Sequence, residues 1–345
     1  MQSASTMAQS VWNTALINIP IEIYKQLCGP RMSTLDKFEL HYHLANNSHQ
    51  IDALLRNKCE TEILAIILEI SNALGLNVKI VAEAVEEGGF REFWKLIQDN
   101  AISITLILTL AQALISAAPL FLKSEKEELE KQLIRLQIEE SQYRLEALKL
   151  ETKVKSPSQK TINKAISQLS KNLKIIKRKS NFYELLTHSP DIKKVGFSLS
   201  NSKTNFNHEE KIVLREDFKD FILNSNKLKS EETETTIEIV SPVLKEGKYK
   251  WKGIYNKLAI SFQMLDMKFK DAVILENIAF QHGTYITCIL RISRELDEVG
   301  EIKITGYAVT TVIEKIDASS ANETSQGREY RQAKKYIAGQ GNLFT

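Results

Sequence analysis

The spacing of apolar residues changes several times along the chain, and each change predicts a different element. Apolar and polar residues alternate from Phe38 to Tyr42, which predicts a strand, and the following Asn46-Asn47 pair predicts a hairpin turn. From Gln50 to Leu74 apolar residues recur every three or four positions, so a helix with one buried face is expected. A second helix is expected to begin near Phe90. Together these elements predict an α+β region over residues 1–98.

A run without any charge follows, and it is the strongest apolar pattern in the chain. Residues 99–122 contain the segment Ala101–Leu122, AISITLILTLAQALISAAPLFL. At about 1.5 Å per residue, a helix of this length spans the roughly 30 Å core of a bilayer. Flanking basic residues would place its C-terminal side in the cytosol, although no signal peptide precedes it. A helix buried in an oligomer core is the alternative. The side chains expected to enter a membrane are Ile104, Leu106, Leu108, Leu110 and Leu114.

Two charged helices are expected next. Residues 123–154 carry an apolar stripe of period 3.5, which favours either a coiled coil between copies of the chain or a helix folded back on its own domain. Residues 155–180 hold eight lysines or arginines and no acidic residue as far as Lys179. This pattern suits anionic lipid, nucleic-acid phosphates or simply the solvated face of a packed helix. The basic side chains expected to make contacts are Lys171, Lys174, Lys177, Arg178 and Lys179.

The C-terminal part predicts a separate β domain. The connector over residues 181–232 is polar and mostly irregular, with one strand expected around Val195–Leu199 and one helix near Asp217–Leu223. After it, residues 233–316 show three strand patterns, one helix and two further strands. That order is typical of an OB-type small barrel, a fold that often presents aromatic and basic side chains to single-stranded nucleic acid. The candidate partner face comprises Tyr249, Trp251, Lys252 and Tyr255. Trp251 could equally belong to the core.

The last segment, residues 317–345, is polar and is expected to be a flexible tail. Its ending resembles the short peptides with which bacterial proteins dock on the replication sliding clamp, and a plain terminus is the alternative. The residues that would dock are Gln340, Leu343 and Phe344.

Composition narrows the class of protein. The 345 residues are 43% hydrophobic, which is enough for two or three compact units. The net charge is only +3, so electrostatic binding must come from local clusters. The three cysteines are widely spaced and form no CxxC pair, which favours reduced thiols in a cytosol.

Motifs for catalysis are weak or missing. The sequence has no GxxxxGK[ST], GxGxxG, GxSxG or HExxH pattern, so nucleotide hydrolysis, Rossmann cofactors and zincin chemistry are not expected. His41 and His43 share one face of the predicted strand and His49 follows its turn, but without a clear carboxylate partner no metal is predicted. Pro190-Asp191 with Glu209-Glu210-Lys211 fits a loose metal-dependent nuclease pattern. Because that pattern is common by chance, we predict no catalytic residue and no cofactor.

Three stretches together resemble a family of uncharacterised bacterial proteins. They are RNKCETEILAIILEI (Arg56–Ile70), EAVEEGGFREFWK (Glu83–Lys95) and SPVLKEGKYKWKG (Ser241–Gly253). The resemblance implies an N-terminal α/β region, an apolar helix and a small C-terminal β domain. It also implies a bacterial source and a stress or phage-defence setting, and it carries no activity or catalytic residue.

These observations give an α+β chain with two main functional hypotheses. In the first, a non-enzymatic protein associates with membrane lipid at the bacterial inner membrane, assembles as a homo-oligomer through its central helices and binds a partner through the β domain. In the second, a soluble cytoplasmic protein binds nucleic acid through the basic helix and the barrel, and the apolar helix is buried.

Overall fold

A computed structural model describes residues 35–45, 50–83, 90–117, 159–202, 209–275, 278–317 and 320–341. The chain divides into two compact units. The first comprises residues up to Asn226 together with Leu296–Glu301, and the second comprises Lys227–Glu295 with the segment from Ile302 onward. The coiled coil predicted over residues 123–154 lies outside the described residues, and so do Leu343 and Phe344 of the predicted docking tail.

The first unit is built on a five-stranded antiparallel sheet with the order β2-β3-β1-β4-β5. The strands are β1 (Lys37–Leu44), β2 (Lys79–Glu83), β3 (Phe90–Ile97), β4 (Ile192–Ser200) and β5 (Lys211–Leu214). The central strand β1 pairs with β3 and β4, so the hairpin predicted directly after it does not form. The helix predicted near Phe90 is also wrong, because that segment is strand β3.

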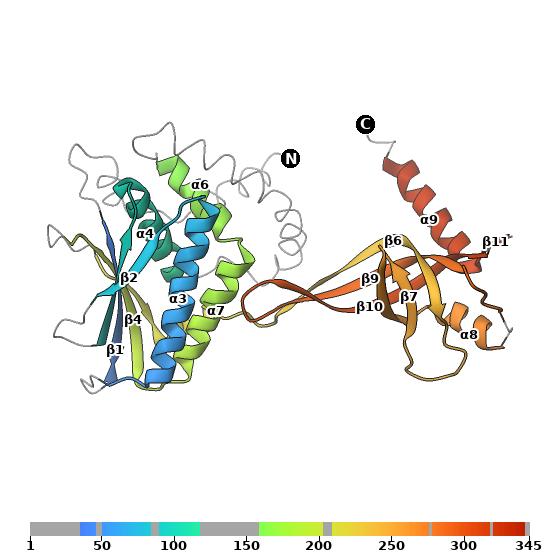
Figure 1. Ribbon diagram of the computed structural model, residues 1–345, viewed down its shortest axis with the longest axis horizontal. Coiled ribbons are helices and arrows are strands. Elements are labelled where there is room, and N and C mark those ends of the chain that lie inside the picture. The colour runs from blue at the N-terminus through green and yellow to red at the C-terminus, as the bar shows by residue number, and fades with distance from the viewer. Residues whose placement is uncertain are drawn as a thin grey trace, which may run out of the picture. The chain divides into compact units, whose positions relative to one another are not determined.

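Helices α3 (Ala53–Ala73) and α7 (Leu173–Thr187) lie side by side against one face of this sheet (Figure 1). Helix α6 (Gln159–Leu169) precedes α7, and a 3-10 helix, η2 (Arg215–Phe221), follows β5. The buried apolar side chains of β1 are Phe38, Leu40 and Tyr42, and they join the same core as the apolar face of α3. Because side chains alternate across a strand, Glu39, His41 and His43 lie on the opposite face.

The apolar run forms helix α4 (Ala101–Ser116), which belongs to the core of the first unit. Four of the five side chains predicted to enter a membrane are buried there, and Leu106 packs against that core from a half-buried position. Polar side chains on α4 also find partners inside the unit, since the Gln112 amide donates to the carbonyl of Phe197 at 2.7 Å. Within the described ranges, no helix combines the length and apolar composition that crossing a bilayer requires. The predicted transmembrane helix is therefore unsupported.

The second unit is a five-stranded barrel. Its elements are β6 (Lys227–Ser241), β7 (Trp251–Tyr255), β8 (Leu258–Met264), α8 (Met267–Leu275), β9 (Tyr285–Leu296) and β10 (Ile302–Asp317). The strands follow the order β10-β8-β7-β6-β9, and a further pairing of β9 with β10 closes the ring. Strands β8 and β10 are parallel, whereas β6, β7 and β8 pair antiparallel in sequence. The predicted succession of three strands, a helix and two strands is confirmed.

Two segments are more regular than their composition indicates. In the connector, residues 181–232, the expected strand is β4 and the expected helix corresponds to η2. The same residues also contain the end of α7, all of β5 and the start of β6, which were not predicted. The predicted flexible tail contains β11 (Ser320–Glu323), which pairs with β10, and α9 (Ser325–Gly341). Polar side chains hold this end of the chain, because the Thr324 hydroxyl donates to the carbonyl of Val312 and the Gln326 amide donates to Asp266 at 2.9 Å.

Candidate ligand-binding site on the barrel unit

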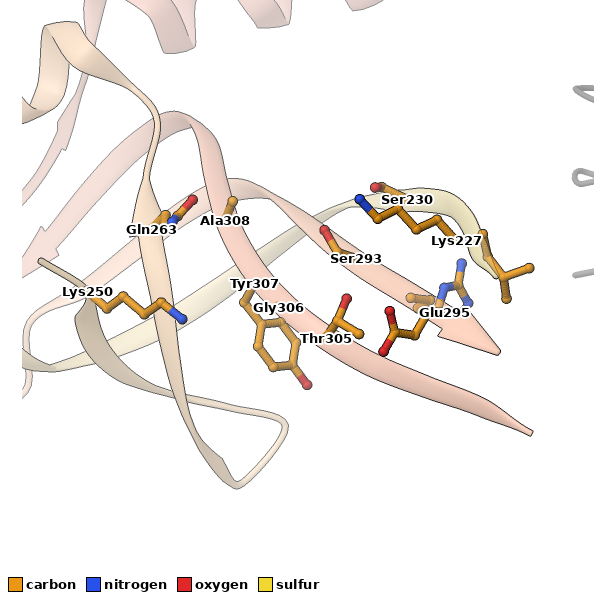
Figure 2. A pocket seen from close by; sticks show the side chains of 12 residues that line it. Lys227, Ser230, Lys250, Gln263, Ser293, Glu295, Thr305, Gly306, Tyr307 and Ala308 are labelled. Atoms are coloured by element: carbon orange, nitrogen blue, oxygen red, sulfur yellow. The ribbon is translucent and has the colours of Figure 1, made fainter. Parts of the chain in front are cut away.

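A hollow of about 360 Å³ opens on the barrel unit (Figure 2). Its walls come from the first part of β6, the last parts of β8 and β9, and the first half of β10, and Lys250 precedes β7 at one side. The lining is polar, with hydroxyl, amide and charged groups around a single aromatic ring. The residues that line the hollow are Lys227, Leu228, Ser230, Lys250, Gln263, Ser293, Arg294, Glu295, Thr305, Gly306, Tyr307 and Ala308.

Positive charge predominates in this hollow. Lys227, Lys250 and Arg294 contribute three cationic groups, and Glu295 contributes the one carboxylate of the lining. The Arg294 guanidinium lies 3.1 Å from the Glu231 carboxylate, and its side chain is only 12% exposed. Among the described residues, its Nε is buried without a hydrogen-bond partner. An unsatisfied buried donor is costly, so a ligand oxygen at this position would be stabilised.

A basic loop adjoins the hollow, connecting β6 to β7. It carries Lys245, Lys248 and Lys250, and all three are exposed. Tyr249 stands between two of these lysines with 58% of its surface exposed. Gly247 has a φ of +134°, and a Cβ there would lie 2.7 Å from the Tyr249 ring. The absence of a side chain at residue 247 therefore lets this ring lie against the loop backbone.

The four residues of the predicted partner face differ in how far they are exposed to solvent. Tyr249 and Lys252 are exposed, as the prediction requires. Trp251 is 1% exposed and packs in the barrel core against Phe262, so it belongs to the core and not to a partner face. Tyr255 is half-buried, and its ring meets the edge of Tyr307 with centroids 6.4 Å apart.

Several hollow residues were not predicted from the sequence. Lys227, Arg294 and Tyr307 come from three different strands, and only the closure of the barrel brings them to one place. The pattern KYKWK at residues 248–252 was the one local signal, because alternating basic and aromatic residues are typical of nucleic-acid contacts.

The predicted basic helix makes most of its contacts inside the first unit. The Lys177 ammonium donates to the Asn226 side chain at 3.0 Å, and Arg178 pairs with Glu62 at 3.2 Å. Lys179 is buried and donates to the carbonyls of Leu114 and Ala117, near the end of α4. Lys174 pairs with Glu301 at 3.3 Å, and Lys171 is half-buried. Few of the five predicted contact groups are thus presented to a phosphate or lipid surface.

The loose nuclease pattern is not assembled. Asp191 directly precedes β4 and Glu210 directly precedes β5, and these strands are antiparallel with Phe197 opposite Lys211. The two carboxylates therefore lie at opposite ends of the strand pair, separated by roughly 20 Å at the usual rise per residue. Such a distance is too long for two ligands of one metal ion.

Comparison with known proteins gives no match, whether against protein-family models, curated proteins or solved structures. The resemblance to a family of uncharacterised bacterial proteins therefore stays a prediction.

Proposed function

We propose that this protein binds single-stranded nucleic acid on its barrel unit, which is OB-like in the order and direction of its strands. The single observation that carries the proposal is the exposed lysine loop with Tyr249 beside the cationic hollow of Lys227, Lys250 and Arg294. In barrels of this class, ligands lie across the second and third strands and against the loops that border them. Here those strands are β7 and β8, and the lysine loop leads into β7.

Each group has a defined role in this proposal. The lysines contact phosphates, because an ammonium is a mobile point charge that tolerates any base sequence. The exposed face of Tyr249 stacks on a base, which contributes about 1–3 kcal/mol per base in such proteins. Arg294 is held by its pairing with Glu231 and contributes a positive charge to the lining of the hollow. The proposal requires no cofactor and no catalytic step.

Fluorescence anisotropy of a labelled 20-nucleotide single strand, titrated with the full-length protein at several salt concentrations, tests the proposal. The logarithm of the affinity is expected to fall linearly with the logarithm of salt, by about 0.7 for each neutralised phosphate. Changing Lys248 and Lys250 together to Glu should lower the affinity at least about tenfold and flatten this slope. The matched control is Lys268→Glu with Lys335→Glu, since both are exposed lysines of the same unit outside the loop and the hollow.

A second pair of variants separates stacking from charge. Tyr249→Ala is expected to weaken binding by about 1–3 kcal/mol with the salt slope unchanged. Tyr336→Ala is the control, because Tyr336 is exposed to a similar degree on α9. Equal affinities for both tyrosine variants and both lysine double variants would contradict the proposal, as would the absence of binding at low salt.

A further inference from the structure

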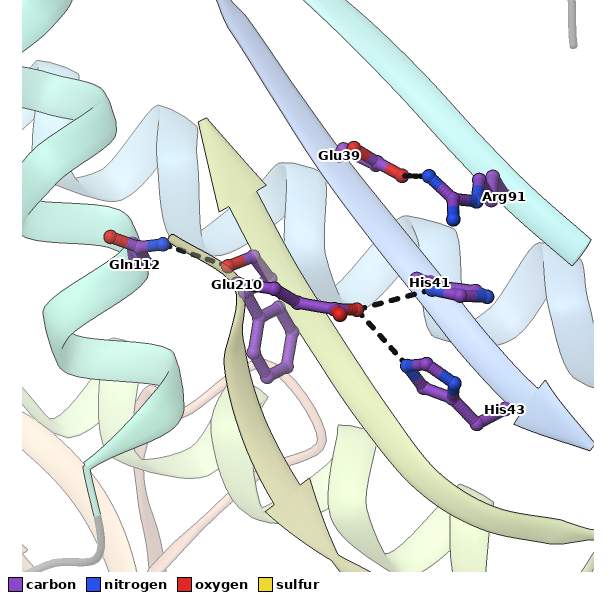
Figure 3. Close-up of polar contacts among 7 residues, drawn as sticks. Glu39, His41, His43, Arg91, Gln112 and Glu210 are labelled. Carbon is purple, nitrogen blue, oxygen red and sulfur yellow. Dashed lines mark hydrogen bonds and ion pairs between the residues drawn. The ribbon is translucent and has the colours of Figure 1, made fainter. Parts of the chain in front are cut away.

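Two histidines of β1 and one carboxylate meet on the face of the first unit's sheet that lies opposite α3 and α7. His41 and His43 are two residues apart on the strand, so their rings point to the same side and lie 3.7 Å apart between centroids. Glu210 extends between them (Figure 3), and a single oxygen, Oε1, lies 3.1 Å from His41 Nδ1 and 3.0 Å from His43 Nε2. All three potential ligand atoms lie within 4.8 Å of one another.

The backbone is shaped to bring this carboxylate to the histidines. Glu210 directly precedes β5, and β4 separates β5 from β1, so its side chain must cross the middle strand. It crosses at Gly196, which is the register partner of His41. A Cβ on residue 196 would lie 1.7 Å from the Glu210 Oε1 atom. Glycine inside a strand is unfavourable and commonly marks a close approach of another group, and here that group is the carboxylate.

Helix α4 helps to hold the same segment. The Gln112 side chain donates to the carbonyl of Phe197 at 2.7 Å (Figure 3). It also lies 3.5 Å from the carbonyl of Glu209. The residue that precedes Glu210 is thus fixed to the sheet by a buried amide. The position of the carboxylate therefore depends on three elements, β4, β5 and α4.

The ligand set and its spacing are those of a transition-metal site. Two atoms bound at about 2.0–2.1 Å to one tetrahedral zinc ion lie roughly 3.3 Å apart, which is close to both nitrogen–oxygen distances here. Two imidazoles and one carboxylate suit zinc and other borderline divalent metals, whereas magnesium and calcium prefer oxygen ligands. We propose that His41, His43 and Glu210 bind one divalent transition-metal ion of the zinc class, with a further coordination position left for water or another ligand.

The surroundings are compatible with a cation. The three side chains are 13%, 22% and 29% exposed, so an ion can reach them from solvent. Arg91 is the register partner of His41, and its charge is partly offset by the Glu39 carboxylate at 2.8 Å.

Metal titration of the chelator-treated full-length protein tests this site. Calorimetry with zinc is expected to include one binding event of micromolar or tighter Kd. Cobalt(II) should give the visible absorption of a bound, low-coordinate ion. His43→Gln and Glu210→Gln should each weaken this event at least tenfold, whereas His282→Gln, at an exposed histidine of the barrel unit, should leave it unchanged.

Gly196→Ala provides a test that keeps all three ligands. The atoms that would meet the new methyl group belong to the flexible Glu210 side chain, so the sheet can form while the carboxylate moves away. Circular dichroism should be unchanged, and the zinc affinity should fall as in Glu210→Gln. The proposal is overturned if the folded wild type binds no zinc, or if Glu210→Gln, His43→Gln and Gly196→Ala all bind it as the wild type does. The outcome is independent of nucleic-acid binding, which is measured on the other unit.

Discussion

At the scale of single residues, two glycines of the barrel strands differ in the space available for a side chain. Gly253 lies on β7 between the neighbouring strands β6 and β8, and a Cβ there would lie 2.6 Å from a methyl group of Ile237 and 2.7 Å from the carbonyl oxygen of Glu238. Gly306, on β10, has no heavy atom within 4 Å of the same constructed position. A methyl group at residue 253 must therefore displace backbone, whereas one at residue 306 enters open space.

Gly253→Ala is expected to lower the free energy of unfolding of the barrel by about 1–3 kcal/mol, because overpacking strains a closed core. Gly306→Ala is expected to change it by less than about 1 kcal/mol. Hydrogen exchange of the β7 amides in increasing urea measures both values for the barrel alone. Similar midpoints for the two variants would show that the barrel core can relax around residue 253.

The titration of Lys179 is coupled to the stability of the first unit. Burial lowers its pKa from an ordinary value of 10.5 to about 8. The folded chain therefore releases this proton near pH 8, whereas the unfolded chain keeps it up to about pH 10.5. Between these values the unfolded state binds more protons, so the contribution of Lys179 to the free energy of unfolding rises with pH by about 3 kcal/mol. Parallel pH profiles of the wild type and Lys179→Met would contradict this expectation.

At the scale of elements, the structure explains why the apolar pattern in the sequence predicted helix α3 correctly and strand β3 incorrectly. Helix α3 was predicted within a few residues because its apolar stripe is local, and Gly75 ends it with a φ of +70°. Strand β3 was mistaken for a helix because its buried face contains Glu92 between Phe90 and Trp94. That carboxylate pairs with Arg56 of α3, a partner that strand alternation cannot reveal.

The burial of helix α4 in the first unit can be tested by substitution. Leu108 is fully buried in the first unit, so Leu108→Ala should lower the free energy of unfolding by about 2–5 kcal/mol. Leu54→Ala is the matched control, because Leu54 on α3 is 71% exposed, and its cost should be below about 1 kcal/mol. Chemical denaturation measures both values. An unchanged stability of Leu108→Ala, with loss of the protein from carbonate-washed membranes, would favour insertion of the apolar run instead.

At the scale of the whole molecule, the two units differ in how much of their structure could be predicted from the sequence. The barrel order could be predicted because its strands follow one another with clear turns. The His41, His43 and Glu210 cluster could not, although both histidines were noted together, because the carboxylate stands 169 residues from His41 along the chain. The role of Gln112 could not be predicted either, because its partners are strand and loop carbonyls distant in sequence.

Zinc should act on one unit and leave the other unchanged. At about one hundred times its Kd, a ligand of the folded state adds about 2.7 kcal/mol to the free energy of unfolding. Hydrogen exchange of the β1 amides should therefore slow about a hundredfold wherever it requires unfolding of the first unit, whereas the β7 amides should exchange as before. Equal slowing of β1 and β7 would mean that the two units unfold as one.

The division of the chain also bears on its synthesis. Leu296–Glu301 belongs to the first unit, although the whole stretch Lys227–Glu295 of the barrel unit is translated before it. During translation, the first unit therefore cannot be completed until most of the barrel strands have left the ribosome. A ribosome stalled just after Asn226 would carry a nascent chain whose first unit still lacks that segment. Arrest beyond Glu301, once that segment has cleared the exit tunnel, would be the earliest point at which this unit can be complete.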